Sequence, residues 1–169
     1  MGDIDQIRQS LPYRQCVGAM VLNESNHVFV GKRASNFAPI IEHPWQMPQG
    51  GLDEMEAPLE GALRELYEET SIRSVVMIDQ TPSWLTYDLP DELLGSALKG
   101  KFRGQKQLWF VMRFTGYDSE INVTNPGNGK FKAEFESWKW VPMDELVGLI
   151  VPFKRDVYRQ IVKQFSHLA

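Results

Sequence analysis

Three carboxylates lie close together in the segment GGLDEMEAPLEGALRELYEETSIR, residues 50–73. Glu65, Glu68 and Glu69 fall within five residues, and on a helix they share one arc about 100° wide. Like charges at this spacing repel one another by a few tenths of a kcal/mol per pair, whereas a solvated helix face usually mixes both signs. A divalent cation would explain the convergence, because Mg²⁺ binds hard oxygen ligands together with substrate phosphates. The alternative is a charged outer face of the helix.

The same segment predicts the helix that carries these acids. Pro58 fits the first helical turn, where its missing N–H would have no helical partner in any case. Gly61 falls on the acidic arc one turn before Glu65, although a glycine inside a helix costs about 1 kcal/mol relative to alanine. We therefore expect Gly61 to leave space beside the carboxylates. A separate apolar stripe consists of Leu59, Ala62, Leu63 and Leu66.

The rest of the chain alternates between strand and turn patterns. Apolar or alternating runs predict strands, and the amphipathic run from residue 153 onward predicts a C-terminal helix. Residues 34–44 contain turn formers and two prolines, which predict a loop. Strands are expected at residues 15–23, 27–33, 74–79, 105–117 and 134–142, the first two forming a hairpin. Without a repeat or an interdomain linker, residues 1–169 are expected to form one α/β domain with a mixed sheet.

Composition and charge limit the function classes. The chain has 169 residues, enough for a core in one domain, and its single Cys16 excludes an internal disulfide and fits a reducing compartment. We find neither a secretory leader pattern nor an apolar run of about eighteen residues, so we expect a cytoplasmic protein that does not contact membranes. With a net charge of −4, an anionic substrate must be held by a local basic patch or a metal. No Ser/His/Asp set stands out, so we expect direct attack by water.

The acidic segment resembles a known motif. Its spacing over residues 50–72 resembles the Nudix box of hydrolases that cleave a nucleoside diphosphate linked to another group. One position differs, because Ser71 replaces a glycine that normally ends the helix in a left-handed conformation, which serine tolerates less well. The matching positions are Gly50, Glu56, Arg64, Glu65, Leu66, Glu68, Glu69 and Ile72.

The resemblance covers nearly the whole chain, about residues 13–165. Beside the box, WLTYDLP, GQKQLWF and PFKRDVY are similar to segments of bacterial RNA pyrophosphohydrolases and plant-type dinucleoside polyphosphate hydrolases. The resemblance implies the Nudix α/β/α sandwich with a mixed sheet. It implies either removal of pyrophosphate from 5′-triphosphorylated RNA, which would start mRNA decay, or cleavage of diadenosine tetraphosphate and its relatives. These segments favour RNA, and the presence of every box glutamate disfavours a catalytically inactive nucleotide-binding module.

Helix geometry and the resemblance together assign the metal ligands. Glu65 and Glu69 lie about 40° apart on the helix and are the first choice as ligands of Mg²⁺, or of Mn²⁺ in its place. Glu68 is a further ligand, and the backbone carbonyl of Gly50 would complete the site. A cation held there would polarise phosphate oxygens and lower the pKa of an attacking water.

Two further roles are assigned mainly by the resemblance. Glu134 matches the residue that accepts a proton from water in these relatives, although a single Glu before a strand is more often solvated. Arg64 and Glu56 have the spacing of a family bridge that holds the loop to the catalytic helix. Their alternative is a surface ion pair worth less than about 1 kcal/mol.

Substrate binding requires positive charge and a stacking surface. A basic run, made up of Lys99, Lys101, Arg103 and Lys106, would hold a polyphosphate or an RNA backbone, or would be a solvated loop. The resemblance implies that Phe153 stacks on a base with Arg33 on the other side of that base, and the alternative for Phe153 is a core residue of the C-terminal helix. The family positions that approach the phosphates or the base are matched by Arg14, Arg33, Tyr87 and Lys154.

Overall fold

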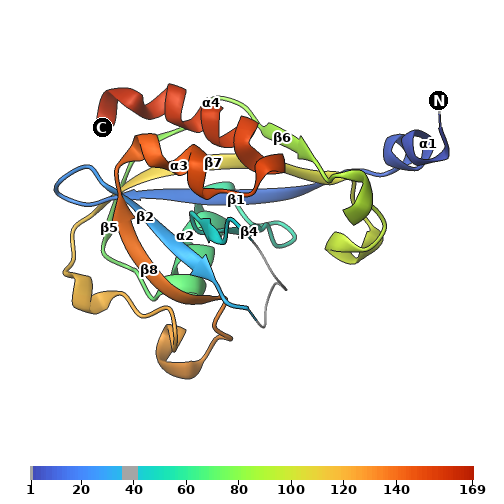
Figure 1. The fold of residues 1–169 in the computed structure, drawn as a ribbon. Helices are drawn as coiled ribbons and strands as arrows, with labels where there is room; N and C mark the ends of the chain where they lie inside the picture. Colours follow the sequence, from blue (N-terminus) through green and yellow to red (C-terminus); the bar gives the residue numbers. More distant parts are fainter. Residues whose placement is uncertain (1, 36–41) are drawn as a thin grey trace.

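A mixed sheet of eight strands lies at the centre of the computed structural model, which describes residues 2–35 and 42–169 (Figure 1). The strands are β1 (Tyr13–Leu22), β2 (Val28–Arg33), β3 (Trp45–Gln46), β4 (Gln49–Gly51), β5 (Val75–Gln80), β6 (Leu85–Asp88), β7 (Gly104–Phe114) and β8 (Phe135–Val141). The α-helices are α1 (Asp3–Ser10), α2 (Pro58–Thr70), α3 (Leu146–Leu149) and α4 (Arg155–Phe165). Short 3₁₀ turns are η1 (Asp91–Leu93), η2 (Ala97–Gly100), η3 (Asp118–Glu120), η4 (Pro126–Gly129), η5 (Met143–Glu145), η6 (Pro152–Lys154) and η7 (Ser166–Leu168).

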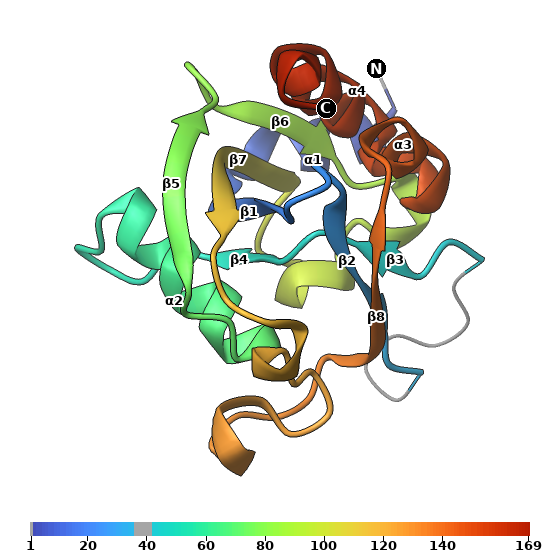
Figure 2. The same ribbon diagram turned by 90° about the vertical axis from the view of Figure 1, so that its left-hand side faces the viewer.

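Two strands, β4 and β2, pair with different parts of the same edge of β1, so the sheet branches at this strand. β1 and β7 run parallel along their whole length, and β5 and β6 pair with the other edge of β7. β4 pairs with the first part of β1, where Cys16 lies opposite Gly51. β2 pairs with the far end, where Leu22 lies opposite Val28, and then continues to β3 and β8. Figure 2 shows β2 and β8 on one side of β1 and β5 on the other.

Alternate side chains of β1 and β7 face two separate cores. Met20 and Trp109 pack into the cluster that includes the buried side of α4, whereas Val17 and Phe110 pack into the cluster that includes α2. Each fully buried side chain of this size stabilises the fold by about 1.5–3 kcal/mol relative to its exposure. Helices α3 and α4 therefore cover one face of the sheet and α2 covers the other (Figure 1). The expected α/β/α sandwich with a mixed sheet is confirmed.

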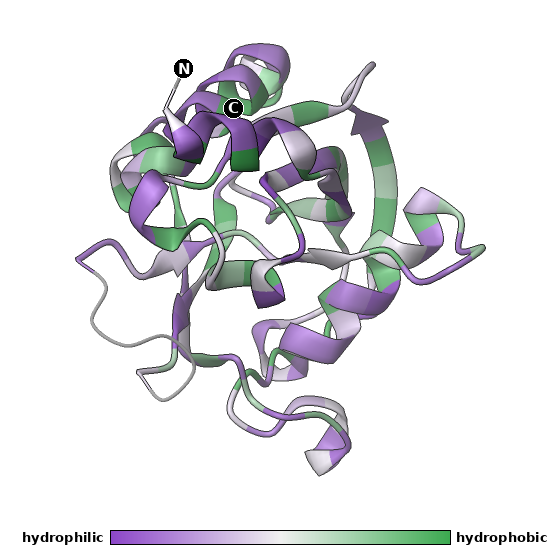
Figure 3. Cartoon of the chain, turned by 90° about the vertical axis from the view of Figure 1, so that its right-hand side faces the viewer, coloured by the Kyte–Doolittle hydropathy of each residue, from purple (hydrophilic) through white to green (hydrophobic). Residues whose placement is uncertain are grey.

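Hydropathy follows these layers. Figure 3 shows hydrophilic residues on much of the visible helix surface and hydrophobic residues along the central strands. Helix α4 is the clearest example, because its apolar residues recur at helical spacing. Val157, Tyr158, Ile161 and Phe165 are buried, and Val162 is partly buried. None of the described helices combines the length and the apolar character that a bilayer span requires.

Helix α2 begins and ends as its sequence dictates. Pro58 occupies the first turn, as predicted, and the helix stops at Thr70. Ser71 then adopts the left-handed conformation, with φ 66° and ψ 6°, that a glycine would take at this position. The predicted apolar stripe is narrower than expected, because Ala62 and Leu66 are buried while Leu63 is 39% exposed.

The elements missed from the sequence are short or lie at the edge of the molecule. The hairpin of β1 and β2, the strands β5, β7 and β8, and the helices α2 and α4 are confirmed. Sequence patterns did not predict α1, which buries no residue, or α3, β3, β4 and β6, which are too short to show a period. Most of the predicted loop at residues 34–44 lies outside the described residues.

Candidate active site

Arg64 fastens the loop before α2 to the helix. Its guanidinium donates to both carboxylate oxygens of Glu56 at 2.7 and 2.9 Å and to the Gly51 carbonyl at 3.0 Å. The ion pair lowers the pKa of the Glu56 carboxyl, chiefly through the hydrogen bonds from Arg64. Both side chains are mostly buried, and the bidentate geometry makes the contact more than a loose surface pair. The bridge between Glu56 and Arg64 that the spacing suggested is therefore present.

Gly61 has a different role from the one expected. A Cβ at this position would lie 2.6 Å from Leu52 Cδ2 and 2.9 Å from Glu56 Oε1. The space above Gly61 is thus filled by the loop that precedes the helix, and it does not lie beside the candidate metal ligands. Glycine is required because any side chain would push the Glu56 carboxylate away from its bridge.

Glu69 is the most buried carboxylate of the helix. Its exposed fraction is 1%, and its Oε1 accepts a hydrogen bond from the Gln49 backbone N–H at 3.2 Å. Its Oε2 is buried without a hydrogen-bond partner among residues 2–35 and 42–169. Burial, followed by the charges of Glu134 and Glu65, raises the pKa of Glu69 well above its ordinary value. An ionised carboxylate in this position needs a positive partner.

Glu65 and Glu134 complete an acidic wall, which we define as Glu65, Glu68, Glu69 and Glu134. Burial raises the pKa of Glu65 despite its hydrogen bond from Arg64 at 2.9 Å. Burial also raises the pKa of Glu134, which the charge of Glu68 raises further and that of Arg33 lowers. The carboxylate of Glu134, the residue directly before β8, therefore interacts electrostatically with the acids of α2.

The oxygen donors of the acidic wall suit a divalent cation, but their side chains are not arranged around a common point. Among residues 2–35 and 42–169, no three His, Cys, Asp or Glu side chains are grouped closely enough to hold a metal ion as they stand. Arg64 instead donates to Glu65 and also to Glu68, the latter at 3.3 Å. The unpaired Glu69 oxygen and the mutually repelling carboxylates are hard oxygen donors, which a nearby positive charge would stabilise. The donor set therefore suits a cation such as Mg²⁺.

Gly50 makes room for the acidic wall. A Cβ at Gly50 would lie 2.2 Å from the carboxyl carbon of Glu65, so only glycine lets the β4 backbone approach this carboxylate so closely. The predicted contribution of the Gly50 carbonyl to a metal site stays a prediction, although the residue lies beside Glu65 as that prediction requires.

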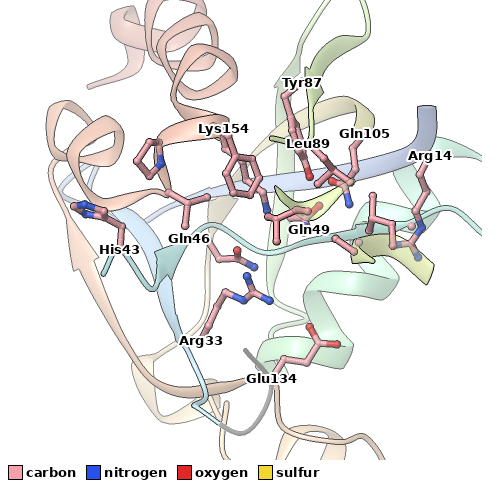
Figure 4. A pocket seen from close by; sticks show the side chains of 18 of the residues that line it. Arg14, Arg33, His43, Gln46, Gln49, Tyr87, Leu89, Gln105, Glu134 and Lys154 are labelled. Atoms are coloured by element: carbon pink, nitrogen blue, oxygen red, sulfur yellow. The ribbon is translucent and has the colours of Figure 1, made fainter. Parts of the chain in front are cut away.

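A cavity of about 990 Å³ opens beside the acidic wall. Figure 4 shows Arg33, Gln46 and Lys154 pointing into it from β2, β3 and η6. Of the predicted site residues, those that line it are Arg14, Arg33, Gly50, Glu65, Tyr87, Glu134, Phe153 and Lys154. Glu42 lines the cavity as well, so three carboxylates and three cationic side chains face one space. The cationic side chains suit a substrate that carries phosphates.

The aromatic part of the cavity consists of Tyr87 and Phe153. Their ring centroids are 5.7 Å apart with an interplanar angle of 45°, and Phe153 is only partly buried. The Lys154 Nζ lies 5.5 Å from the Tyr87 ring centroid. Burial and the neighbouring charge of Arg33 lower the pKa of Lys154 to about 8. Phe153 is packed against the core and also lines the cavity. Its stacking on a base stays a prediction.

A network of glutamine side chains that was not predicted from the sequence forms part of the cavity. Trp109 donates to Gln107 at 2.9 Å, and Gln107 donates to Gln105 at 2.8 Å and to Gln49 at 3.3 Å. Gln49 and Gln105 line the cavity, as does Gln46. The available signal was the pattern QKQLW, which places two uncharged polar residues on the buried face of a strand. Such amides remain buried only when they are hydrogen-bonded or serve a ligand.

The geometry corrects two members of the predicted basic run. Lys106 is outside the set of described residues that line the cavity, and its Nζ lies 5.4 Å from the Trp84 ring centroid. Lys106 is next to Gln105 on β7 and therefore faces the opposite side of the sheet. Arg103 is held by Asp88 at 2.8 Å and stacks on Tyr13. The basic run is therefore divided between different surfaces.

Comparisons with known proteins agree with this geometry. Residues 12–161 match the family model described as NUDIX domain. The chain is 57% identical over 162 residues to "RNA pyrophosphohydrolase" of Bradyrhizobium diazoefficiens, covering 95% of this chain and 96% of that protein. It is 55% identical over 162 residues to the protein of the same name from Rhodopseudomonas palustris, with the same coverage.

Solved structures share the fold at much lower identity. The E. coli dihydroneopterin triphosphate pyrophosphohydrolase superposes with a TM-score of 0.65 at 17% identity, covering 90% of this chain and 99% of that one. A C. elegans Ap4A hydrolase binary complex gives a TM-score of 0.62 at 15% identity, covering 91% and 98%. At these identities the likeness concerns the fold alone.

Proposed function

Because the chain belongs to the NUDIX family, we propose that it removes pyrophosphate from 5′-triphosphorylated RNA and leaves a 5′-monophosphate. The observation that carries the proposal is one cavity with buried carboxylates on one side and Arg14, Arg33 and Lys154 on the other. The similarity to proteins named RNA pyrophosphohydrolase supports the choice of substrate. The proposed location is the cytoplasm, since the substrate is a newly made transcript, and the proposed role is the start of mRNA decay.

Nudix hydrolases use divalent cations, and here the proposed ion is Mg²⁺, with Mn²⁺ able to replace it. Glu65 and Glu69 would hold it together with Glu68 and the Gly50 carbonyl. The support is the buried, unpaired Oε2 of Glu69 and the burial that disfavours its charge without a cation. When bound, the cation supplies charge neutralisation at the phosphates and lowers the pKa of a water.

Glu134 is the proposed general base. Its carboxylate lines the cavity beside Glu65, and its raised pKa brings it closer to the pH at which proton transfer is effective. Arg33 faces it and lowers that pKa in part, which keeps the carboxylate able to accept a proton. Water then attacks the phosphorus without a covalent enzyme intermediate.

The opposite side of the cavity binds and orients the substrate. Arg14, Arg33 and Lys154 pair with phosphate oxygens, and arginine presents a planar pair of donors for this purpose. Phe153 offers a ring face on which a base stacks, which is worth about 1–3 kcal/mol. Gln105 accepts from Gln107 and lines the cavity, where its amide N–H groups would donate to substrate.

One observation favours a second candidate, hydrolysis of a dinucleoside polyphosphate. Since Arg103 is paired with Asp88 and Lys106 lies on Trp84, only Lys99 and Lys101 of the basic run remain for phosphates further along an RNA. A substrate without a downstream chain has no need of such contacts. The cavity residues themselves serve either substrate, because both present a polyphosphate and a base.

The deciding experiment compares both substrates at matched concentrations. We expect a higher kcat/KM for a short 5′-triphosphorylated RNA than for diadenosine tetraphosphate, with pyrophosphate as the product from RNA. If the dinucleotide is hydrolysed faster and the RNA is left intact, the second candidate replaces the first.

A Lys99→Gln, Lys101→Gln double variant sharpens that comparison. If these lysines contact RNA phosphates, the salt dependence of RNA binding should become shallower by about 0.7 per contact, and dinucleotide hydrolysis should not change. Lys163→Gln, at an exposed position on α4 far along the chain from the basic run, is the matched control.

A further inference from the structure

Ser71 occupies a position where its backbone is unfavourable. Its φ of 66° lies in the left-handed region, which glycine enters freely and other residues enter at a cost. The residue directly follows the last turn of α2, whose carboxylates form most of the acidic wall. A serine kept at such a position calls for a role of its side chain.

The Ser71 hydroxyl fastens a distant loop to the end of α2. It donates to the Asn122 carbonyl at 3.0 Å and accepts from the Gly127 N–H at 3.0 Å. A glycine at residue 71 could make neither contact. The loop that contains η4 is therefore held by both hydrogen-bonding functions of one side chain.

Two further contacts dock the same loop on α2. The Asn122 N–H donates to the Thr70 carbonyl at 2.9 Å. The Phe131 ring meets the Tyr67 ring edge to face, with centroids 5.9 Å apart. Residues 122–131 thus lie against the C-terminal half of the helix, and Ser71 provides the central polar contact.

The docked loop leads directly to Glu134. Two residues lie between Phe131 and Glu134, and the three chain steps from one to the other span at most about 10 Å. The position of the loop therefore limits the position of that carboxylate. On its other side Glu134 is fixed by its backbone carbonyl, which accepts from the Ala34 N–H at 2.9 Å. Releasing one of these two anchors leaves Glu134 free to shift relative to Glu69.

We propose that Ser71 is a positioning residue, whose hydroxyl clamps residues 122–131 to α2 and thereby sets Glu134 against the carboxylates of that helix. The inference rests on the proposed function, since it assigns Ser71 to the placing of the proposed general base. A serine merely tolerated at this position is the competing explanation. The two explanations predict different values of kcat for a variant that removes the hydroxyl and also relieves the backbone strain at residue 71.

Ser71→Gly separates the hydroxyl from the backbone. This variant removes the strain of the left-handed conformation and both hydrogen bonds, whereas Ser71→Ala removes the hydrogen bonds and keeps the strain. We expect both to lower kcat by about 10-fold with little change in KM, because small displacements of reacting groups have effects of this order. We also expect Ser71→Gly to melt at a higher temperature than Ser71→Ala. A Ser71→Gly variant with the kcat of the original protein would overturn the proposal.

Asn26→Gly is the matched control for backbone relief. Asn26 also has a positive φ, 59°, but it lies in the turn between β1 and β2. Its replacement should leave kcat unchanged. A similar fall in kcat for this variant would mean that the loss in Ser71→Gly does not come from the hydroxyl, and would overturn the proposal.

A double-variant cycle tests whether Ser71 acts through Glu134. In the Glu134→Gln background, Ser71→Gly should lower kcat no further, since the displaced group has already lost its function. Fully additive effects would show that Ser71 works by another route, and would contradict the positioning role.

Amide hydrogen exchange gives a readout that does not depend on activity. The Gly127 N–H should exchange faster in both Ser71 variants than in the original protein, because its acceptor is gone. Unchanged exchange would overturn the clamp. If the original protein leaves triphosphorylated RNA intact, the proposed function fails by itself, and the kinetic cycle is then measured on diadenosine tetraphosphate.

Discussion

The two sides of the cavity are built in opposite ways. Three of the four carboxylates of the acidic wall come from a single helix and lie within five residues of the chain. The binding side takes Arg14 from β1, Arg33 from β2, Tyr87 from β6 and Lys154 from η6. The first side is local in sequence, and the second exists only when four separate segments meet.

The two sides also differ in how well their charges are compensated. On the acidic wall, burial raises the pKa of Glu65, Glu69 and Glu134, and one oxygen of Glu69 has no hydrogen-bond partner in the part of the chain that the structure describes. The binding side sets its cations among glutamine amides that are hydrogen-bonded to one another. Uncompensated buried charge is costly unless a partner arrives. We therefore expect the acidic wall to need a bound cation, whereas the binding side needs no such partner before substrate arrives.

Removing the cation should have the largest effect. Excess EDTA should abolish hydrolysis, because the carboxylates alone neither neutralise phosphate nor activate water, and added Mg²⁺ or Mn²⁺ should restore it. Initial rates before and after dialysis measure this. Full turnover in excess chelator would show that the acidic wall needs no cation, and would remove this difference between the two sides of the cavity.

A thermal measurement tests the same dependence without turnover. Mg²⁺ should raise the melting temperature by binding only the folded state, and Glu69→Gln should reduce that rise. Equal shifts in the two proteins would remove Glu69 from the set of ligands.

Loss of the general base should have the next largest effect. Glu134→Gln should lower kcat by about 10²–10⁴, because the amide cannot accept the proton from water. Substrate and metal affinity should change little, which calorimetric titration can check. Glu136→Gln, at an exposed position two residues later on β8, is the control. Weakened metal binding with kcat intact would make Glu134 a ligand instead.

Truncation on the binding side should be milder. Phe153→Ala should weaken transition-state binding by about 1–3 kcal/mol through loss of base stacking, so that kcat/KM falls by roughly 5- to 150-fold. RNA and dinucleotide should be affected alike, since each presents a base. Phe153→Leu keeps apolar volume and tests stacking separately from packing. An unchanged kcat/KM in the alanine variant would assign Phe153 to the core alone.

The smallest effect concerns pH. The pKa of Lys154 is lowered to about 8 by burial, so its positive charge is present below this pH and lost above it. Attraction to phosphate should weaken accordingly, and kcat/KM should decline as the pH rises from about 8 to about 10. Lys154→Arg should remove this decline, because arginine stays protonated. The same decline in both proteins would exclude Lys154 as its source.

The sequence was sufficient to predict an element wherever a single segment contains both the periodic pattern of that element and its functional residues. The pattern from Gly50 to Ile72 predicted α2 and its first turn at Pro58, and its resemblance to the Nudix box implied the Glu56–Arg64 bridge. The structure contains all three. Helical spacing likewise predicted α4. These features depend on neighbours along the chain, which a periodic pattern records directly.

The sequence by itself determined which residues form the acidic wall on α2, since a helix fixes the angular position of every side chain that it carries. Only the tertiary structure decided the rest. It divided the basic run, because Arg103 found Asp88 and Lys106 faced the other side of the sheet. It also brought Gln46, Gln49 and Gln105 together in the lining of the cavity. Along β1, the partner strand at this edge changes from β4 to β2. Such contacts depend on strand pairing between distant segments, and no local period encodes that pairing.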